Sequence, residues 1–237
     1  MNILLFRSQE RVAGSSRIRL HGARAGHVRD IYGAQPGKRL RSGEIDGDIG
    51  EATLLSSDSD SVTLAFQPLR PPPQKRPLTV VLALPRPKML RRMLRTVAEI
   101  GVRELHLVNA QRVEKSFWQS GLLANATLES YLISGLEQSV DTVLPRLYLH
   151  RGFRPFAEDR LPGLAATRRA LLAHPGAESA CPAGDGARDT LLMIGPEAGF
   201  VDFEVMLAQR AGLRPVSLGS RILRTETALS VVLGRFL

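Results

Sequence analysis

The stretch LLMIGPEAGFVDFEVMLAQRAGLRPVSLGSRILRTETALS, residues 191–230, decides how the second half of the chain folds. Its apolar start, Leu191–Ile194, predicts a buried strand. That strand should end at the following Gly-Pro pair, because proline has no amide hydrogen for a sheet ladder. A helix is expected next, with Asp202 as its cap. A second short strand at Arg214–Leu218 and a further helix complete an alternation of strand, loop and helix.

Two glycine-bearing loops in this stretch form the best site candidate. Gly195 and Gly199 allow the backbone to come close to a ligand. The second loop, residues 219–227, places two arginines and a carboxylate beside the apolar start of a helix. A buried connection does not need that much charge, so we expect this loop to carry chemistry.

Both loops resemble motifs of the SPOUT superfamily of RNA methyltransferases. More narrowly, they resemble the family that methylates N3 of a uridine in 16S ribosomal RNA. The Gly-Pro-Glu-Gly-Gly-Phe signature of that family corresponds to Gly195–Phe200, with a departure at Ala198, and its Ser-Leu-Gly-x-Arg-Ile-Leu-Arg-x-Glu-Thr-Ala signature corresponds to Ser217–Ala228. The resemblance covers most of residues 78–237 and, more loosely, residues 1–66. It implies an α/β fold with a C-terminal trefoil-knotted parallel sheet and flanking helices, preceded by a small PUA-like β-barrel.

The chain divides into two predicted domains. Residues 1–68 consist of short alternating segments between turn signals, which favours a small barrel, and by resemblance this barrel is PUA-like and binds RNA. Residues 69–77 are rich in proline and are predicted to be an extended linker. Residues 78–237 alternate strand and helix, as in a parallel sheet covered on both faces, and by resemblance form the SPOUT-type methyltransferase domain.

Two expectations concern the later part of that second domain. Residues 152–188 are rich in glycine and proline and should be mostly loop, with one short helix near Ala165–Ala173. The last predicted helix, Thr225–Leu237, is still apolar where the chain stops, so the sequence is expected to end inside it.

The chain is strongly basic, with a formal net charge of +9. Residues 1–41 hold nine Lys and Arg against two acids, and residues 67–99 hold eight against one, whereas residues 42–66 hold six acids and no base. Such a concentration of basic residues indicates a polyanionic partner. A composition rich in arginine for reasons unrelated to function is the alternative.

Several classes of protein are excluded by what the sequence lacks. No dinucleotide fingerprint, Walker-type phosphate loop, nucleophile elbow or zinc-protease motif is present. A single cysteine, Cys181, rules out an internal disulfide, and the five histidines are not clustered, so no metal site is expected. No apolar run is long enough for a membrane span, and the N-terminus does not resemble a signal peptide. We therefore expect a cytoplasmic protein.

The resemblance implies S-adenosylmethionine (SAM) as the methyl donor. Glycine loops would give close backbone access to its adenosine, and aliphatic side chains would form apolar walls. The residues expected to bind the cofactor are Leu84, Ile194, Gly195, Pro196, Glu197, Gly199, Ser217, Leu218, Gly219, Ile222, Leu223 and Thr227. The resemblance also places the cluster Glu137-Gln138-Ser139 towards the cofactor region.

Methylation of N3 of a uridine requires loss of a proton, which leaves negative charge on the uracil oxygens. An arginine would stabilise that charge, and Arg224 is the first candidate, with Arg221 as the second. Glu197 or Glu226 could accept the proton or orient an arginine. For Glu226, an interaction with the helix dipole or an ion pair with Arg224 is an equal alternative.

The residues expected to contact RNA are all basic, and for each of them a simple solvated face is the alternative. They are Arg7, Arg17, Arg24, Arg29, Arg91, Arg92 and Arg221. The aromatic and basic segment Arg112–Trp118 could stack on a base, but an anchor for the following helix is favoured.

The expected partners are 16S ribosomal RNA or the small ribosomal subunit, and a second copy of the chain in a homodimer. The dimer is implied by the resemblance. Two rival functions stay open, namely a knotted methyltransferase acting on another ribosomal RNA or transfer RNA position, and a non-catalytic RNA-binding factor for ribosome assembly.

Overall fold

The computed structural model of the chain describes residues 2–237, so residue 1, the first residue of the predicted barrel, lies outside the described residues. Two compact units can be distinguished. The first contains the chain up to Gln74 together with Leu136–Leu144, and the second contains Lys75–Gly135 and Pro145–Leu237. The segment 136–144 therefore clusters with the first unit, although the sequence placed it within the second domain.

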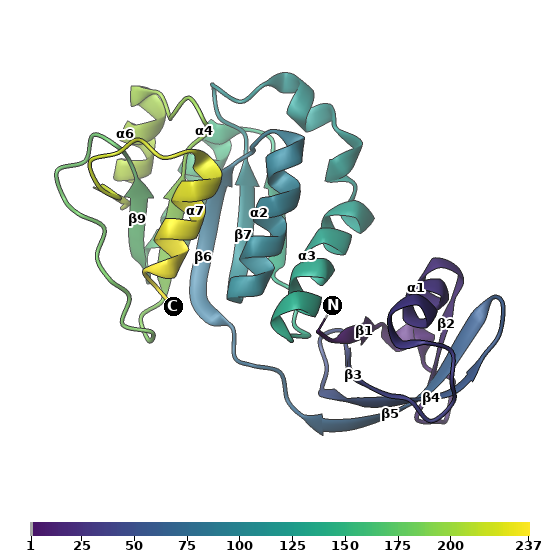
Figure 1. The fold of residues 1–237 in the computed structure, drawn as a ribbon. Helices are drawn as coiled ribbons and strands as arrows, with labels where there is room; N and C mark the ends of the chain where they lie inside the picture. The colour runs from purple at the N-terminus through teal and green to yellow at the C-terminus, as the bar shows by residue number, and fades with distance from the viewer. Residues whose placement is uncertain (1) are drawn as a thin grey trace. The chain divides into compact units, whose positions relative to one another are not determined.

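The first unit is built on a five-stranded, mixed sheet with strand order β1-β3-β4-β5-β2 (Figure 1). Only the β1–β3 pair is parallel. Its elements are β1 (Leu4–Phe6), η1 (Ser8–Glu10), β2 (Arg17–His21), α1 (Gly22–Tyr32), β3 (Arg39–Glu44), β4 (Ile49–Ser57) and β5 (Ser61–Arg70).

One face of this sheet and the helix α1 enclose the core of the first unit. Alternate strand residues supply the apolar side chains, and α1 adds Ala25 and Val28. On β2 the buried positions are Ile18 and Leu20, between exposed neighbours. This period of two is typical of a sheet with one buried face.

The second unit is an α/β structure with a six-stranded sheet, in which every strand pair is parallel and the strand order is β11-β9-β10-β6-β7-β8. Its strands are β6 (Arg76–Ala83), β7 (Val102–Val108), β8 (Arg146–His150), β9 (Arg169–Ala173), β10 (Thr190–Ile194) and β11 (Arg214–Val216). Its helical elements are α2 (Pro87–Ile100), η2 (Lys115–Gln119), η3 (Gly121–Leu123), α3 (Asn125–Ser139), α4 (Phe153–Pro155), η4 (Phe156–Arg160), α5 (Leu161–Ala165), α6 (Asp202–Arg210) and α7 (Thr225–Gly234).

Helices cover both faces of the parallel sheet. The crossovers from β6 to β7 and from β7 to β8 run in one direction, so the right-handed rule places α2 and α3 on the same face. The return from β8 to β9 runs the other way and places α4, η4 and α5 on the opposite face. Helix α7 packs beside α2 (Figure 1). Gly135 lets α3 approach α2 closely, because an added Cβ would lie 2.5 Å from the Arg95 carbonyl oxygen.

The structure corrects three of the predicted boundaries. The predicted helix near Ala165–Ala173 is wrong for its second half, because Arg169–Ala173 is strand β9, which pairs with β10 and β11. The predicted linker 69–77 is shortened, since β5 runs to Arg70 and β6 starts at Arg76, with register irregularities that accommodate the prolines. The last helix ends at Gly234 and does not continue to Leu237.

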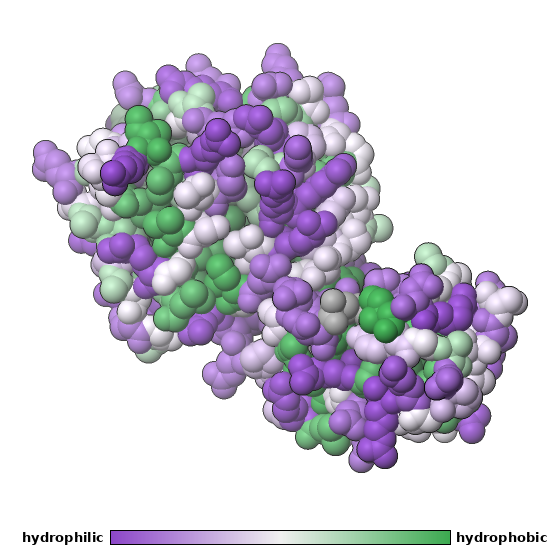
Figure 2. Space-filling model, viewed as in Figure 1, coloured by the Kyte–Doolittle hydropathy of each residue, from purple (hydrophilic) through white to green (hydrophobic). Residues whose placement is uncertain are grey.

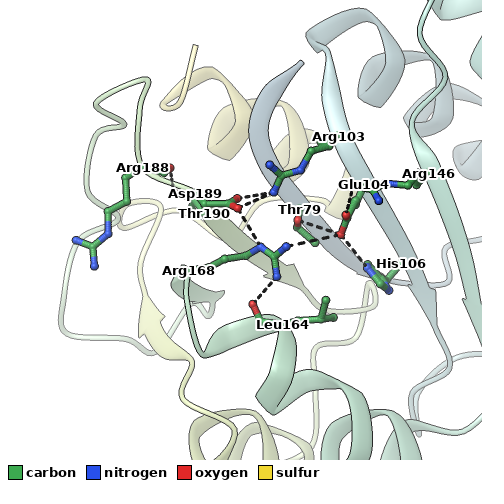
Figure 3. Close-up of polar contacts among 10 residues, drawn as sticks. All are labelled: Thr79, Arg103, Glu104, His106, Arg146, Leu164, Arg168, Arg188, Asp189 and Thr190. Carbon is green, nitrogen blue, oxygen red and sulfur yellow. Dashed lines mark hydrogen bonds and ion pairs between the residues drawn. The ribbon is translucent and has the colours of Figure 1, made fainter. Parts of the chain in front are cut away.

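A polar network closes the amino ends of the parallel strands (Figure 3). The buried carboxylate of Glu104 on β7 lies 2.7 Å from an Arg146 guanidinium nitrogen and 4.0 Å from one of Arg168. Arg168 and Arg103 both contact the Asp189 carboxylate, at 3.4 and 2.7 Å. These ion pairs link β7, β8 and the segments that precede β9 and β10.

His106 lies next to this network on the same face of β7. Its Nδ1 is 3.0 Å from His150 Nε2, and its ring stacks on Tyr148 with centroids 4.7 Å apart. Burial, together with the neighbouring His150, lowers the pKa of His106 to about 4, although Glu104 acts in the opposite direction. The imidazole is therefore neutral in the folded protein at neutral pH.

This depressed pKa predicts a pH-dependent stability. Because the unfolded chain binds a proton at His106 below about pH 6.5 and the folded chain only below about pH 4, the free energy of unfolding should fall as the pH drops through this window. Replacing His106 by Phe should reduce the slope of the free energy of unfolding against pH in this window by up to about 1.4 kcal/mol per pH unit. Urea unfolding followed by the fluorescence of the buried, single Trp118 measures this in the second unit. Tyr148→Phe alters the same stack without removing an imidazole, so an equal slope change in that control would contradict the prediction.

Candidate active site

A pocket lies at the carboxyl ends of β9, β10 and β11, opposite the polar network in the same sheet. It measures about 130 Å³. Three chain segments line it, each following one of these strands, and together they contribute Ala173, His174, Pro175, Ile194, Gly195, Pro196, Glu197, Gly199, Phe200, Leu218, Gly219, Arg221, Ile222, Leu223, Thr225 and Ala228. The carboxyl edge of an open parallel sheet is the usual position of a ligand site.

The loop after β10 is shaped by two glycines. An added Cβ at Gly195 would lie 3.0 Å from the Phe200 ring, so this position has no room for a side chain unless the ring moves. Gly199 has φ +74°, a left-handed conformation that favours glycine. Its amide donates to the Pro196 carbonyl at 2.8 Å, which closes a tight turn. Ala198 is exposed in this turn, so its departure from the Gly of the related motif is accommodated.

Two arginines from other strand ends hold this loop. Arg86, which precedes α2, donates from Nε to Oε1 of Glu197 at 2.7 Å and from Nη2 to Oε2, so the two side chains form a bidentate pair. Arg112, which follows β7, donates to the Ala198 carbonyl at 2.6 Å.

A buried carboxylate anchors the neighbouring segment. Glu204 on α6 accepts the backbone amides of Gln111 at 2.7 Å and Val201 at 3.1 Å. Val201, and not Asp202, is the residue that caps α6, because Asp202 is already its first helical residue. The loop after β7, which contains Arg112, is thereby fixed to the start of α6.

The second loop starts from a short backbone ladder. Ser217 donates its amide to the Ser179 carbonyl and accepts the Cys181 amide, both at 2.8 Å. Its Oγ also lies 3.2 Å from the Gly219 amide, and Gly219 has φ +126°. Within residues 2–237, the backbone of Ser220–Leu223 forms no hydrogen bond outside regular elements. This stretch can therefore move without breaking the ladder.

Charged groups surround the mouth of the pocket. The Arg86 guanidinium holds the pKa of Glu197 below its ordinary value, and Arg224 acts in the same direction. Conversely, Glu197 and, more weakly, Glu226 raise the pKa of Arg86. A carboxylate stabilised in this way is a weak proton acceptor, but it is well placed to orient an arginine.

The pocket brings together most of the residues that the sequence predicted for a cofactor. Ile194, Gly195, Pro196, Glu197, Gly199, Leu218, Gly219, Ile222 and Leu223 line it. The other three do not. Leu84 is buried, and its amide donates to the Val108 carbonyl. Ser217 contacts the second loop through the hydrogen bond between its Oγ and the Gly219 amide. Thr227 is exposed on α7. These roles for individual residues stay predictions.

The candidate catalytic residues lie around the same pocket. Glu197 lines it, whereas Arg224 caps α7 with its carbonyl and Glu226 lies in the first turn of that helix. Arg221, predicted to contact RNA, is also part of the lining.

The sequence missed the end of β9 and the two residues after it, Ala173–Pro175, and the side chains of Phe200, Thr225 and Ala228. Recognising β9 as a strand would have pointed to the first of these. The cluster Glu137–Ser139 does not line the pocket. Glu137 belongs to the first unit instead, where burial raises its pKa and Arg24 and His27 counteract this.

The predicted RNA-binding arginines differ in how free they are. Arg91 and Arg92 are exposed on α2, with Arg91 5.9 Å above the Tyr131 ring. Arg17 is exposed on β2. Arg24, in contrast, is engaged by Glu10 at 2.5 Å and by the Leu5 carbonyl.

Arg29 is also engaged, since it donates to the Asp58 carbonyl at 2.7 Å and to that of Ser59 at 3.2 Å. Arg7 has interactions within the protein too.

In the described part of the chain, no group of three or more His, Cys, Asp or Glu is placed to hold a metal ion. No helix among residues 2–237 is both long and apolar enough to cross a membrane.

Comparisons with known proteins identify the family of the chain. Residues 72–237 match the family model described as RNA methyltransferase domain. The ribosomal RNA small subunit methyltransferase E of Treponema pallidum is 32% identical over 232 residues, which cover 96% of this chain and 87% of that protein.

Two solved structures share the fold. One is a ribosomal RNA small subunit methyltransferase E from Neisseria gonorrhoeae bound to S-adenosyl methionine, with a TM-score of 0.77, 21% identity, and coverage of 98% of this chain and 95% of that one. The other, from Legionella pneumophila, is described as a methyltransferase in complex with SAM, with a TM-score of 0.76, 23% identity and the same coverage of 98% and 95%.

The anchoring role of Glu204 gives a prediction. Glu204→Ala should lower the free energy of unfolding by roughly 2 kcal/mol, because it leaves two backbone donors without their acceptor. Asp202→Ala is the matched control, since Asp202 is an exposed acid in the same first turn and should cost less than about 1 kcal/mol. Urea unfolding monitored through Trp118 compares the two variants. Equal losses would show that helix-end charge, and not the bond to Gln111, accounts for the effect.

Proposed function

Because the chain belongs to the family of RNA methyltransferase domains, we propose that it transfers the methyl group of SAM to N3 of a uridine in the 16S ribosomal RNA of the small subunit. The observation that carries this proposal is the pocket, which is built from the two motif loops at the carboxyl edge of the sheet. The names of the relatives support the choice of RNA. The protein would act in the cytoplasm, where ribosomal subunits are assembled.

The residues of the pocket suit SAM. The close packing at Gly195 and the left-handed turn at Gly199 leave backbone groups accessible, and Leu218, Ile222 and Leu223 supply apolar walls. When bound, SAM supplies an electrophilic methyl group on a sulfonium. The volume of about 130 Å³ is below the roughly 300–1,000 Å³ typical of small-molecule sites, so the loop Ser220–Leu223 is expected to open for the ligand.

The protein's own residues would then handle the charge that develops on the uracil. Arg224, beside the mouth of the pocket, would stabilise the oxygens that become negative when N3 loses its proton. Arg221 in the lining is the second candidate. Glu197, held ionised by Arg86, fits the role of orienting arginines better than that of a base. Glu226 is then the better candidate for accepting the proton. The target base would have to be turned out of its stack, at a cost of a few kcal/mol.

The trefoil knot belongs to the same proposal. Residues 179–181 hydrogen-bond to Ser217, before the second loop, and Gly184 donates to the Arg235 carbonyl at 2.6 Å, after α7. The segment 174–189 is thus tied to both ends of the final loop and helix. This arrangement supports the passage of the C-terminal segment through an earlier loop.

A homodimer and an RNA-binding, PUA-like first domain complete the proposal. Hydrophobic surface gathers over α7 and the loop before it, next to hydrophilic surface over α2 (Figure 2). Ile222, Val231 and Leu237 contribute exposed apolar side chains, with 87%, 38% and 63% of their surface accessible. A second copy packed there would cover this surface. The curled, mixed sheet and basic charge of the first unit support a small RNA-binding barrel.

Cofactor binding can be tested directly by calorimetry. The wild-type protein should bind SAM saturably. Ala228→Phe should weaken binding at least tenfold, because Ala228 lines the pocket from α7 and a phenyl ring would fill it. Gln209→Phe is the control, on the exposed side of α6 and away from both the pocket and the surface over α7, and should bind normally. A folded wild-type protein that does not bind SAM would favour the non-catalytic RNA-binding factor.

Catalysis gives a second test. Arg224→Gln should lower the turnover number by about 10²- to 10³-fold, the usual effect of removing a donor to a developing oxyanion. SAM affinity should stay within threefold. Methyl transfer from labelled SAM to unmodified small subunits and to free 16S ribosomal RNA measures turnover, and reverse-transcription stops locate the modified uridine. Arg210→Gln serves as the charge-matched control on α6. Full turnover in the Arg224 variant would exclude this role.

A further inference from the structure

The outer face of the sheet in the first unit carries a second set of arginines. Strand register places Arg39 on β3 opposite Thr53, Thr53 opposite Ala65, and Ala65 opposite Arg17 on β2. Arg19 and Arg41 follow at a spacing of two residues, which keeps them on the same face as Arg17 and Arg39. Two pairs of arginines therefore flank one surface of a single sheet.

The core fixes the direction of these side chains. Ile18 and Leu20 on β2 and Leu40 on β3 are buried in the opposite face. Because successive side chains on a strand alternate, burial of the even positions forces the arginines at the odd positions towards solvent. A shift of register by one residue would expose this core, so the fold itself holds the arginine face in place.

These arginines are free, unlike several others in the same unit. Among residues 2–237, the guanidinium groups of Arg17, Arg19 and Arg41 have no hydrogen bond or ion pair. Arg39 lies 3.9 Å from Glu51, a loose contact between side chains that are 76% and 53% exposed. By contrast, Arg11 binds Glu44 at 2.6 Å and cannot be turned outward without losing an internal partner.

A groove runs along the β3 side of this face. It measures about 400 Å³ and contains three arginines, 39, 41 and 70, but a single carboxylate, that of Glu51. Gly50 is needed for the shape of this groove. The pairing of β4 with β5 shifts register at Gly50, and the strands approach so closely that an added Cβ would lie 2.0 Å from the Gln67 carbonyl oxygen. Leu69, 60% exposed, adds an apolar side chain to the lining.

We propose that this face binds the phosphate backbone of the RNA substrate, with Arg39, Arg41 and Arg70 holding phosphates in the groove and Arg17 and Arg19 continuing the contact on β2. This inference rests on the proposed function for the identity of its ligand. Residues two apart on a strand lie roughly 7 Å apart, so each pair presents two separate guanidinium forks. A guanidinium matches a phosphate in a bidentate geometry.

The chemistry of the face favours the backbone of RNA over its bases. The outward positions on β2 to β5 between the arginines hold Glu51, Thr53, Thr63, Ala65 and Gln67, without an aromatic ring on which a base could stack. Phosphate contacts of this kind position an RNA and carry no sequence information themselves. Selection of the uridine would then be left to the second unit.

The test compares two double variants with a control of equal charge. Arg39→Gln/Arg41→Gln and Arg17→Gln/Arg19→Gln should each weaken binding to an unmodified 16S ribosomal RNA transcript at least tenfold at fixed salt. The slope of log affinity against log salt should shrink by about 1.4 to 1.8, since each variant removes two phosphate contacts and each contact accounts for about 0.7–0.9. Arg188→Gln/Arg210→Gln removes two exposed charges from the second unit and should change affinity less than threefold.

Further measurements separate failure of this face from failure of the proposed function. All variants should keep wild-type SAM binding, which shows that the second unit is intact. If both face variants bind the transcript as well as the control does, while the wild type methylates it, the face is excluded and the function stands. If the wild type binds RNA through this face but neither binds SAM nor transfers methyl groups, the function fails and the face stands. Binding to anionic lipid vesicles in preference to RNA would overturn the choice of ligand.

Discussion

The parallel pairing of β9 with both β10 and β11 is the constraint on which the pocket depends. It brings three strand ends to one edge, although β11 follows β10 in the chain and does not lie beside it. Each strand leaves unpaired backbone groups where it ends, and three loops must satisfy them within a small space. Tight turns at glycine, the ladder at Ser217 and the bonds from Arg112 and Glu204 satisfy backbone groups there. Arg86 holds the loop after β10 in another way, through the side chain of Glu197. The same loops then leave a hollow lined by backbone and aliphatic groups.

Much of this site was visible in the sequence because it is encoded locally. A reader of the sequence can recognise the glycines at positions 195 and 199, and the mixture of apolar and basic residues from Ser217 onwards, without knowing which residues they contact. The segment after β9 was missed because Ala170, Leu171 and Leu172 suit a helix as well as a buried strand, and only their pairing decides between the two. The contact of Arg86 with Glu197 joins residues 111 positions apart, and no local pattern announces it.

Arginine illustrates the same limit in the first unit. The sequence shows where positive charge is concentrated, but not which guanidinium groups the fold itself uses. Arg24 pairs with Glu10 and donates to a backbone carbonyl, and Arg29 donates to two backbone carbonyls, so both contribute to stability. Arg39 and Arg41 have identical chemistry, but among residues 2–237 Arg39 makes only the loose contact with Glu51 and Arg41 makes no hydrogen bond or ion pair, because alternation along β3 turns both away from the core. Burial and register, which are properties of the whole sheet, separate the two groups.

The position of β6 between β7 and β10 has a consequence for synthesis of the chain. One edge of β6 can pair with β7 as soon as that strand has left the ribosome, since the two are separated only by α2. The other edge pairs Leu78 with Thr190, 112 residues later, so it stays open while nearly half of the 237-residue chain is made. An apolar strand with an open edge is prone to pair with other chains. A nascent chain therefore carries an open apolar strand edge after the first half of the sheet has formed and before β10 is made.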